Sequence, residues 1–216
     1  MKRNLFCISI ILAMIICIFD SPNNIAQAAS YNAKAKKEYA KILSSKKTEG
    51  KIIDVGLDIG TEKFALLDVN KDGKLELIFT PDNEYRIQIV FYIHGKLKCM
   101  GLGFSDKHRF YPNKHIVYSQ IMRMGDDTYT YYKYTGNKLM SVASKHGCDY
   151  INAVTGKRKK SGPNGNSYAP YAYTVKGKRV SKKKYKVYVG TLLSGANEVK
   201  LKWHKNTAAN RKKYLK

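Results

Sequence analysis

The chain has 216 residues, and its 40 Lys and Arg against 16 Asp and Glu give a formal net charge of +24 at pH 7. Its length suits one domain, or one domain with a small appendage, and is sufficient to bury a core. It contains no G-x-S-x-G motif, no Walker loop and no dinucleotide-binding fingerprint, so the enzyme classes that depend on those motifs are excluded.

The N-terminus has the pattern of a secretory signal peptide. Lys2 and Arg3 precede the apolar run Leu5–Phe19, which is short for a membrane span, and Ala26-Gln27-Ala28 is a small-x-small cleavage pattern. We therefore expect residues 1–28 to be removed. The mature chain is then a secreted, extracellular protein with no membrane span, and it can associate with the cell wall.

Residues 29–155 are predicted to form a domain with a first helix followed by many hairpins. Ser30 is placed to cap the helix, which would run to about Ser45. Its apolar residues recur at helical spacing and form one stripe, with lysines opposite; they are Ala35, Tyr39, Ile42 and Leu43. Residues 51–59 then alternate loosely and are expected to be extended. Such a helix needs a sheet to cover.

The stretch Phe64–Phe79 is the most informative part of the sequence. It predicts two short strands around an acidic loop, residues 68–76, whose side-chain oxygens recur at alternate positions: Asp68, Asn70, Asp72 and Glu76. The carbonyl of Lys74 would add a further oxygen, and Gly73 suits the sharp turn. Hard cations such as Ca²⁺ take six to eight oxygen ligands, so this pattern predicts a calcium site. A plain hairpin with an Asx-rich turn is the alternative.

The pattern D-x-N-x-D-G-x-x-E between two strands resembles the calcium loops of integrin-alpha-type (FG-GAP) repeats. It is also similar to a recurring segment of poorly characterised secreted proteins of Gram-positive bacteria. The twelfth position of the loop is Phe79 rather than the Glu of a helix-loop-helix EF-hand, so the loop is only EF-hand-like. The resemblance covers about sixteen residues; it implies Ca²⁺ binding and secretion but no particular activity.

After the loop, apolar and aromatic runs are repeatedly paired across turns that contain Gly, as in antiparallel hairpins. The predicted pairs are Ile87–Ile93 with Lys96–Leu102, Ile116–Met124 with Thr128–Tyr134, Tyr131–Tyr134 with Lys138–Val142, and Tyr173–Val175 with Arg179-Val180. The expected fold class is α+β, a mostly antiparallel sheet with helices near both termini. Three turn glycines, Gly95, Gly136 and Gly177, are evenly spaced in the sequence, which either indicates repeated blade-like units or is coincidental.

The last third of the chain is strongly basic. Residues 156–170 are a polar, basic loop, and residues 171–216 are a strand and helix segment expected to pack on the same domain. Ser181 is placed to cap a helix, Val199–Trp203 alternates as a strand would, and Asn206 or Thr207 caps a final helix. The candidate polyanion-binding residues are Lys157, Arg158, Lys159, Lys160, Lys182, Lys183 and Lys184.

Two cysteines, Cys99 and Cys148, remain after removal of the signal peptide. In a secreted chain they can form a disulfide, although the sequence does not show that they meet. Cys148 also has His146 and Asp149 nearby, but a Cys–His catalytic pair is usually assembled by the fold rather than by adjacent positions.

The sequence therefore favours a secreted calcium-binding protein without catalytic activity. Its basic segment would associate with an anionic wall polymer, an acidic glycan or nucleic acid. One alternative is a small calcium-dependent hydrolase, a nuclease or a glycan-cleaving protein, that uses Asp54, Asp58 or the calcium itself. The second alternative is a purely structural secreted protein. Its high positive charge would then be explained by lysines that are simply solvated at the surface.

Overall fold

A computed structural model of the chain describes residues 22–44, 62–80, 86–104, 107–123, 126–135, 138–148 and 171–216. Within these ranges the fold is mixed α+β and mostly antiparallel sheet, with helices near both termini, as the sequence predicts. The predicted extended segment 51–59 and the basic loop 156–170 lie outside the described residues.

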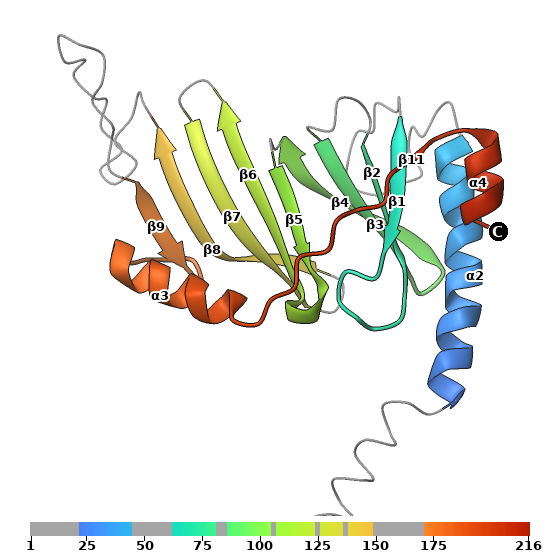
Figure 1. Cartoon of the computed structure of the whole chain (residues 1–216), viewed down its shortest axis with the longest axis horizontal. Coiled ribbons are helices and arrows are strands. Elements are labelled where there is room, and N and C mark those ends of the chain that lie inside the picture. Colours follow the sequence, from blue (N-terminus) through green and yellow to red (C-terminus); the bar gives the residue numbers. More distant parts are fainter. Residues whose placement is uncertain are drawn as a thin grey trace, which may run out of the picture.

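The described strands form two antiparallel sheets that lie side by side in Figure 1. The five-stranded sheet has the order β11-β1-β2-β3-β4, and the six-stranded sheet has the order β10-β9-β8-β7-β6-β5. The strands of the first sheet are β1 (Lys63–Leu67), β2 (Glu76–Thr80), β3 (Arg86–Ile93), β4 (Lys96–Phe104) and β11 (His204–Lys205). Those of the second are β5 (Lys107–Tyr111), β6 (Ile116–Arg123), β7 (Asp126–Thr135), β8 (Lys138–Cys148), β9 (Ala172–Val175) and β10 (Lys178–Arg179).

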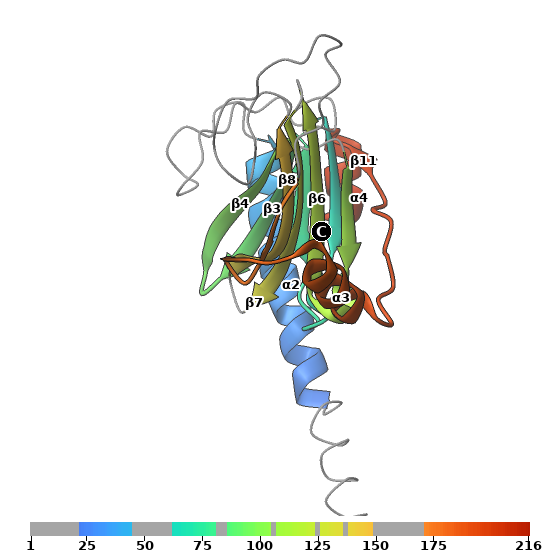
Figure 2. The ribbon, with the colours of Figure 1, turned by 90° about the vertical axis from the view of Figure 1, so that its left-hand side faces the viewer.

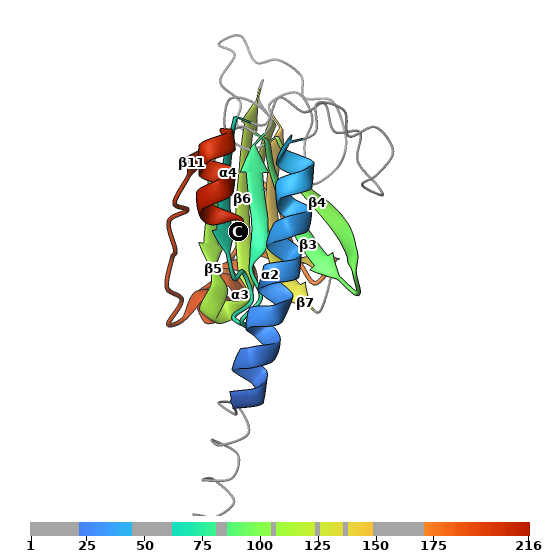
Figure 3. The same ribbon diagram turned by 90° about the vertical axis from the view of Figure 1, so that its right-hand side faces the viewer.

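Helices lie at opposite ends of this double sheet (Figure 1). Helix α2 (Pro22–Ser44) packs on the five-stranded sheet, and α3 (Lys182–Leu193) packs beside β9 of the six-stranded sheet. Helix α4 (Ala208–Tyr214) lies next to α2, as Figure 3 shows. A short 3-10 helix, η1 (Pro112–Lys114), joins β5 to β6. The N-terminal end of α2 extends beyond the sheets (Figure 2).

The alternation of side chains along the strands divides the core into layers. Phe79 and Val90 face α2 in one cluster, whereas Ile78 and Ile89 face the opposite way. The second cluster also contains Phe110, Val117 and Tyr134 from the six-stranded sheet, so both sheets contribute to it. A third cluster, around Ile116 and Tyr118, packs against Leu192 and Leu193 at the end of α3. Because successive residues of a strand point to opposite faces, each sheet serves two of these clusters.

The chain after α3 runs along both sheets and returns to α2. Val199 bridges to Phe110 of β5, and β11 then pairs with β1. Asn206 and Arg211 both donate to the carbonyl oxygen of Leu43, at 2.9 and 3.5 Å. Carbonyls in the last turn of a helix have no partner within the helix, so these two side chains complete the end of α2. The C-terminal segment thus links the two sheets to the first helix.

Two predictions about the fold are corrected. Helix α2 begins at Pro22 rather than Ser30, and proline is well suited to the first turn of a helix. The predicted strand Val199–Trp203 is only a single bridge at Val199 followed by an extended connection. Its alternation arises because Leu201 and Trp203 pack into the cluster between the sheets.

The even spacing of the turn glycines does not mark blade-like units. The β7–β8 and β9–β10 hairpins belong to one sheet, because β8 pairs directly with β9. The β3–β4 hairpin belongs to the other sheet. Strand β5 was not predicted: the first three residues of Lys107–Tyr111 are Lys, His and Arg, so the segment lacks the apolar alternation of a strand.

Candidate functional site

The predicted calcium loop connects β1 to β2 and is folded around the carboxylate of Asp68. The two carboxylate oxygens of Asp68 accept hydrogen bonds from the backbone N–H groups of Asp72, at 3.1 Å, and Gly73, at 2.8 Å. Gly73 has a φ of 82°, a left-handed conformation that side chains disfavour, as the sequence predicts for this position. The loop is therefore a tight turn whose backbone is ordered by the side chains that were predicted as ligands.

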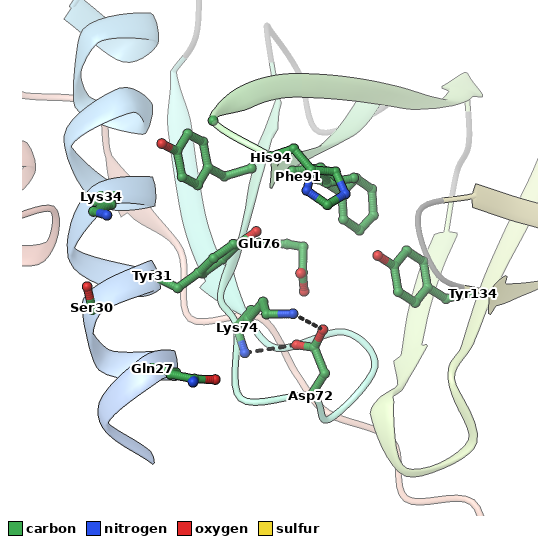
Figure 4. Close-up of a pocket in the computed structure, with 13 residues that line it drawn as sticks. Gln27, Ser30, Tyr31, Lys34, Asp72, Lys74, Glu76, Phe91, His94 and Tyr134 are labelled. Carbon is green, nitrogen blue, oxygen red and sulfur yellow. Dashed lines mark hydrogen bonds and ion pairs between the residues drawn. The ribbon is translucent and has the colours of Figure 1, made fainter. Parts of the chain in front are cut away.

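Asp72 lies on the outer side of this turn. Its Oδ1 accepts the N–H of Lys74 at 2.9 Å, and its Oδ2 lies 3.4 Å from the Lys74 ammonium (Figure 4). Asn70 completes the set, because its Oδ1 accepts the N–H of Asp72 at 3.4 Å. Local acceptance of backbone N–H groups is the ordinary behaviour of Asp and Asn in turns.

Among the described carboxylates, Glu76 is the one that the fold encloses most completely. It is only 3% exposed, and its Oε2 accepts the N–H of Val69 at 2.9 Å. Burial raises the pKa of Glu76 to about 8, and the carboxylates of Asp72 and Asp68 contribute in the same direction. Since burial and like charges both disfavour the ionised form, a cation beside Glu76 would relieve an electrostatic cost built into the loop.

Helix α2 clamps this loop. Asn32 donates from Nδ2 to the carbonyl of Gly73 at 2.9 Å, and its Oδ1 accepts the N–H of Leu75 at 2.8 Å. The hydroxyl of Tyr39 donates to the carbonyl of Leu75 at 3.0 Å. The helix and the loop are therefore joined by side chain to backbone hydrogen bonds, and the shape of one depends on the other.

The chemistry of the donor set suits Ca²⁺, but the described side chains do not converge into a preformed cage. Among the residues that the structure describes, no group of three or more His, Cys, Asp or Glu side chains is placed to hold a metal ion. The carboxylates of Asp68 and Asp72 are directed at backbone N–H groups of the loop instead. A carboxylate oxygen has more than one lone pair and can still bind a cation while it accepts an N–H. Calcium binding by the five predicted ligands, residues 68, 70, 72, 74 and 76, therefore stays a prediction.

A pocket of about 830 Å³ borders the loop. Asp72, Lys74 and Glu76 form one side of it, and residues of α2, of the turn between β3 and β4, and of β7 form the others (Figure 4). The remaining lining residues are Ser30, Tyr31, Lys34, Phe91, Tyr92, Ile93, His94, Gly95 and Tyr134, together with Gln27, which the predicted cleavage after Ala28 would remove. The loop is thus not a closed surface turn but part of the wall of a pocket.

The pKa values of two tyrosines in the pocket are shifted by the loop carboxylates. Burial raises the pKa of Tyr31 and of Tyr134, and the charges of Glu76 and Asp72 raise both pKa values further. Figure 4 shows the side chains of Tyr31 and Tyr134 on opposite sides of Glu76. These two tyrosines come from α2 and β7, so the fold gathers aromatic rings from distant segments around the acidic loop.

The sequence did not predict the aromatic part of this pocket. One signal was available: Tyr31 precedes Ala35 and Tyr39 at intervals of four residues, so it belongs to the same helical stripe. Tyr92 and Tyr134 carried no such signal. The proximity of Tyr92 to the loop depends on the pairing of β3 with β2, and that of Tyr134 depends on how the two sheets pack.

The predicted polyanion-binding residues are partly described. Lys182, Lys183 and Lys184 are exposed in the first turn of α3, whereas Lys157, Arg158, Lys159 and Lys160 lie outside the described residues. On β8, the ammonium of Lys145 lies 4.4 Å from the ring centroid of Tyr129 and 3.7 Å from that of Tyr171. Burial lowers the pKa of Lys145, Asp127 opposes this shift, and Lys182 adds to it. A lysine flanked by two tyrosine rings thus lies near the start of α3.

The remaining candidate residues are the two cysteines and two carboxylates outside the loop. Cys99 is a buried free thiol that donates to Oε1 of Gln88 at 2.8 Å, so the structure does not contain the predicted disulfide. Cys99 lies in the core on β4, whereas Cys148 ends β8 in the other sheet, and its side chain is outside the described set. Asp54 and Asp58, the residues of the hydrolase alternative, also lie outside the described residues.

Comparisons of the chain with protein-family models, with curated proteins and with solved structures found no match. None of the helices in the described part of the chain is both long and apolar enough to cross a membrane. The function must therefore be argued from the residues and contacts of the chain itself.

Proposed function

We propose that this protein is a secreted, calcium-binding protein without catalytic activity, and that its basic C-terminal segment associates with an anionic polymer outside the cell. The observation that carries the calcium proposal is the buried carboxylate of Glu76 beside Asp68 and Asp72. A buried carboxylate that lies beside two other carboxylates is costly to ionise unless a cation accompanies it. Ca²⁺ suits the oxygen donors of Asp68, Asn70, Asp72 and Glu76 together with the carbonyl of Lys74.

Calcium would act here mainly by stabilising the contact between the acidic loop and helix α2. The loop that would hold the ion is also the loop that Asn32 and Tyr39 of α2 grip. Because α2 covers the five-stranded sheet, an ion that rigidifies the loop also stabilises the packing of the first helix. Extracellular calcium sites commonly have dissociation constants of about 10⁻⁴ to 10⁻³ M, which matches the compartment that the predicted signal peptide implies.

Isothermal titration calorimetry tests the calcium proposal directly. We expect about one Ca²⁺ per chain for the wild type and no measurable binding for Asp72→Asn. Glu62→Gln is a matched control, because Glu62 is exposed and lies outside the loop. Equal binding by Asp72→Asn and the wild type would refute the proposed site.

The association with an anionic polymer rests on where the positive charge lies. Residues 171–216 contain 14 Lys and Arg and a single Glu. Lys182, Lys183 and Lys184 occupy the first turn of α3, which is the positive end of the helix dipole. Cations are disfavoured there, so these lysines do not stabilise the helix, whereas an anion would be attracted by both the lysines and the helix end. Lys145 with its two tyrosine rings extends the patch onto the neighbouring strand.

The polymer proposal is tested by comparing two triple variants of equal net charge. One replaces Lys182, Lys183 and Lys184 by Gln; the other replaces the exposed lysines Lys37, Lys96 and Lys138, which lie outside residues 171–216 and do not line the pocket. Binding to teichoic acid, heparin and single-stranded DNA is measured at several salt concentrations. For single-stranded DNA, the first variant should bind more weakly with a log–log salt slope about 2 less negative. Equal losses from both variants would indicate diffuse attraction by the whole protein.

A further inference from the structure

The aromatic side chains of the pocket beside the loop are held in position by contacts with one another. The rings of Phe91 and Tyr134 are stacked, with centroids 5.0 Å apart and an interplanar angle of 7°. The rings of Tyr31 and Tyr92 meet edge to face at 5.5 Å. Each pair joins two different elements, so each ring is held by its partner across an element boundary. Phe91 and Tyr134 are only 1% and 6% exposed, so they contribute little surface to the pocket. The half-buried rings of Tyr31 and Tyr92 are the aromatic surfaces that a ligand can reach.

The side chains that line the pocket carry little net charge, in a chain whose formal net charge is +24. The charge of Asp72 offsets that of Lys74, and Lys34 lies on α2 opposite the buried Glu76. An anionic ligand would meet the carboxylate of Asp72 here. A cationic ligand would compete with the ammonium of Lys74, which lies 3.4 Å from Oδ2 of Asp72 and 5.3 Å from the ring centroid of Tyr31. The surroundings thus favour a ligand with no net charge.

We propose that this pocket binds a neutral saccharide of about two or three sugar units, a size that suits its volume of about 830 Å³. The C–H faces of a sugar ring pack against flat aromatic rings. Hydroxyl groups both donate and accept, so they can pair with carboxylates, with ammonium groups and with the polar groups of Ser30 and His94. The proposed saccharide site shares Asp72, Lys74 and Glu76 with the proposed calcium site, whereas its aromatic rings belong to the pocket alone. The proposal does not depend on polymer binding by the C-terminal segment.

Titration calorimetry with trisaccharides tests this inference. The neutral probes are chitotriose, cellotriose and maltotriose; trigalacturonic acid and the chitosan trimer are charged probes of equal length. We expect at least one neutral probe to bind one per chain and the charged probes to bind more weakly. Tyr92→Ala and Tyr31→Ala should weaken that binding about tenfold, because each removes one wall. Tyr188→Ala, a half-buried tyrosine of α3 outside the pocket, should leave it unchanged.

Each variant is first shown to be folded by circular dichroism, and its melting temperature in calcium and in EDTA is recorded. A Tyr92→Ala protein that loses saccharide binding but keeps its response to calcium supports a separate saccharide site. The inference is wrong if no neutral probe binds at millimolar concentration, or if the tyrosine variants bind as the wild type does. It is also wrong if a charged trimer binds as tightly as the neutral ones through the same tyrosines.

Discussion

Asn32 of helix α2 holds Gly73 of the acidic loop through a hydrogen bond of 2.9 Å from its Nδ2 to the Gly73 carbonyl. The same side chain accepts the N–H of Leu75 at 2.8 Å, so one amide group occupies both a donor and an acceptor of the loop backbone. This pairing couples the conformation of the loop to the position of helix α2. A change in either one should therefore alter the other.

Replacing Asn32 by Ala should lower the free energy of unfolding by about 1 to 3 kcal/mol, because it leaves the half-buried N–H of Leu75 without this acceptor. Chemical denaturation of the wild type and the variant measures the difference. Asn197→Ala is a suitable control, because Asn197 is exposed and its change should stay within about 0.5 kcal/mol. A stability of Asn32→Ala equal to that of the control would show that the clamp is unimportant.

Much of the fold follows from local sequence signals. The β3–β4, β6–β7, β7–β8 and β9–β10 hairpins were each predicted from apolar or aromatic runs around short turns. The caps of the last two helices were also predicted, since the side chains of Ser181 and Thr207 accept backbone N–H groups at 3.3 and 3.2 Å. Such features depend on neighbouring residues, so the sequence contains the information needed to predict them.

The arrangement of the sheets and the pocket could not be predicted in this way. Tyr134 reaches the loop only because β7 packs opposite β3, where it stacks on Phe91. Val199 to Trp203 has the alternation of a strand, but which sheet it crosses is decided by contacts with Phe110 and the core between the sheets. These contacts join residues far apart in the chain, and a local pattern carries no information about them.

Glu76 should make the stability of the calcium-free protein depend on pH. In the folded state its pKa is raised to about 8 by burial, against an ordinary value of 4.5. Between these values the folded protein binds a proton that the unfolded chain has released, so stability should fall as the pH rises from 4.5 to 8. The expected loss is on the order of a few kcal/mol. Urea denaturation in EDTA across this range measures it.

The variant Glu76→Gln should lose most of this pH dependence, because its side chain does not titrate. In EDTA at the upper end of the range it should be more stable than the wild type, since no buried charge forms. Glu62→Gln, at an exposed position, should retain the slope of the wild type. If Glu76→Gln retained that slope too, the pH dependence would have to come from other groups.

Cys99 should be chemically inert in the folded protein. Burial raises the pKa of its thiol to about 12, and the thiolate is the reactive form. In a Cys148→Ser variant without the signal peptide, Cys99 should not react with a thiol reagent until denaturant is added. Mass spectrometry of the non-reduced mature protein should likewise show no Cys99–Cys148 disulfide. Rapid labelling of Cys99 under native conditions would contradict its place in the core.

Gly147 on β8 is required by the ring of Tyr171. A Cβ at this position would lie 2.5 and 2.6 Å from Cε1 and Cδ1 of that ring, which is too close for carbon atoms. Gly147→Ala should therefore displace Tyr171, whose hydroxyl donates to Asp127 at 2.9 Å, and cost about 1 to 3 kcal/mol.

Gly190→Ala provides the contrast, because a Cβ there would have no neighbour within 4 Å and the residue lies inside α3. Alanine is favoured over glycine within a helix, so this change should stabilise the protein by about 0.5 to 1 kcal/mol. Thermal melts of the two variants should move in opposite directions. Similar shifts for both would mean that Tyr171 does not lie over β8.

The most direct test of the central proposal is the melting temperature of the mature protein in millimolar calcium and in EDTA. If calcium exceeds its dissociation constant tenfold, binding to the folded state alone adds about 1.4 kcal/mol and should raise the melting temperature by about 3 to 6 °C. In Asp72→Ala the two melting temperatures should coincide, because that variant lacks one of the loop carboxylates. A wild-type protein that melts at the same temperature in calcium and in EDTA would contradict the calcium-binding account.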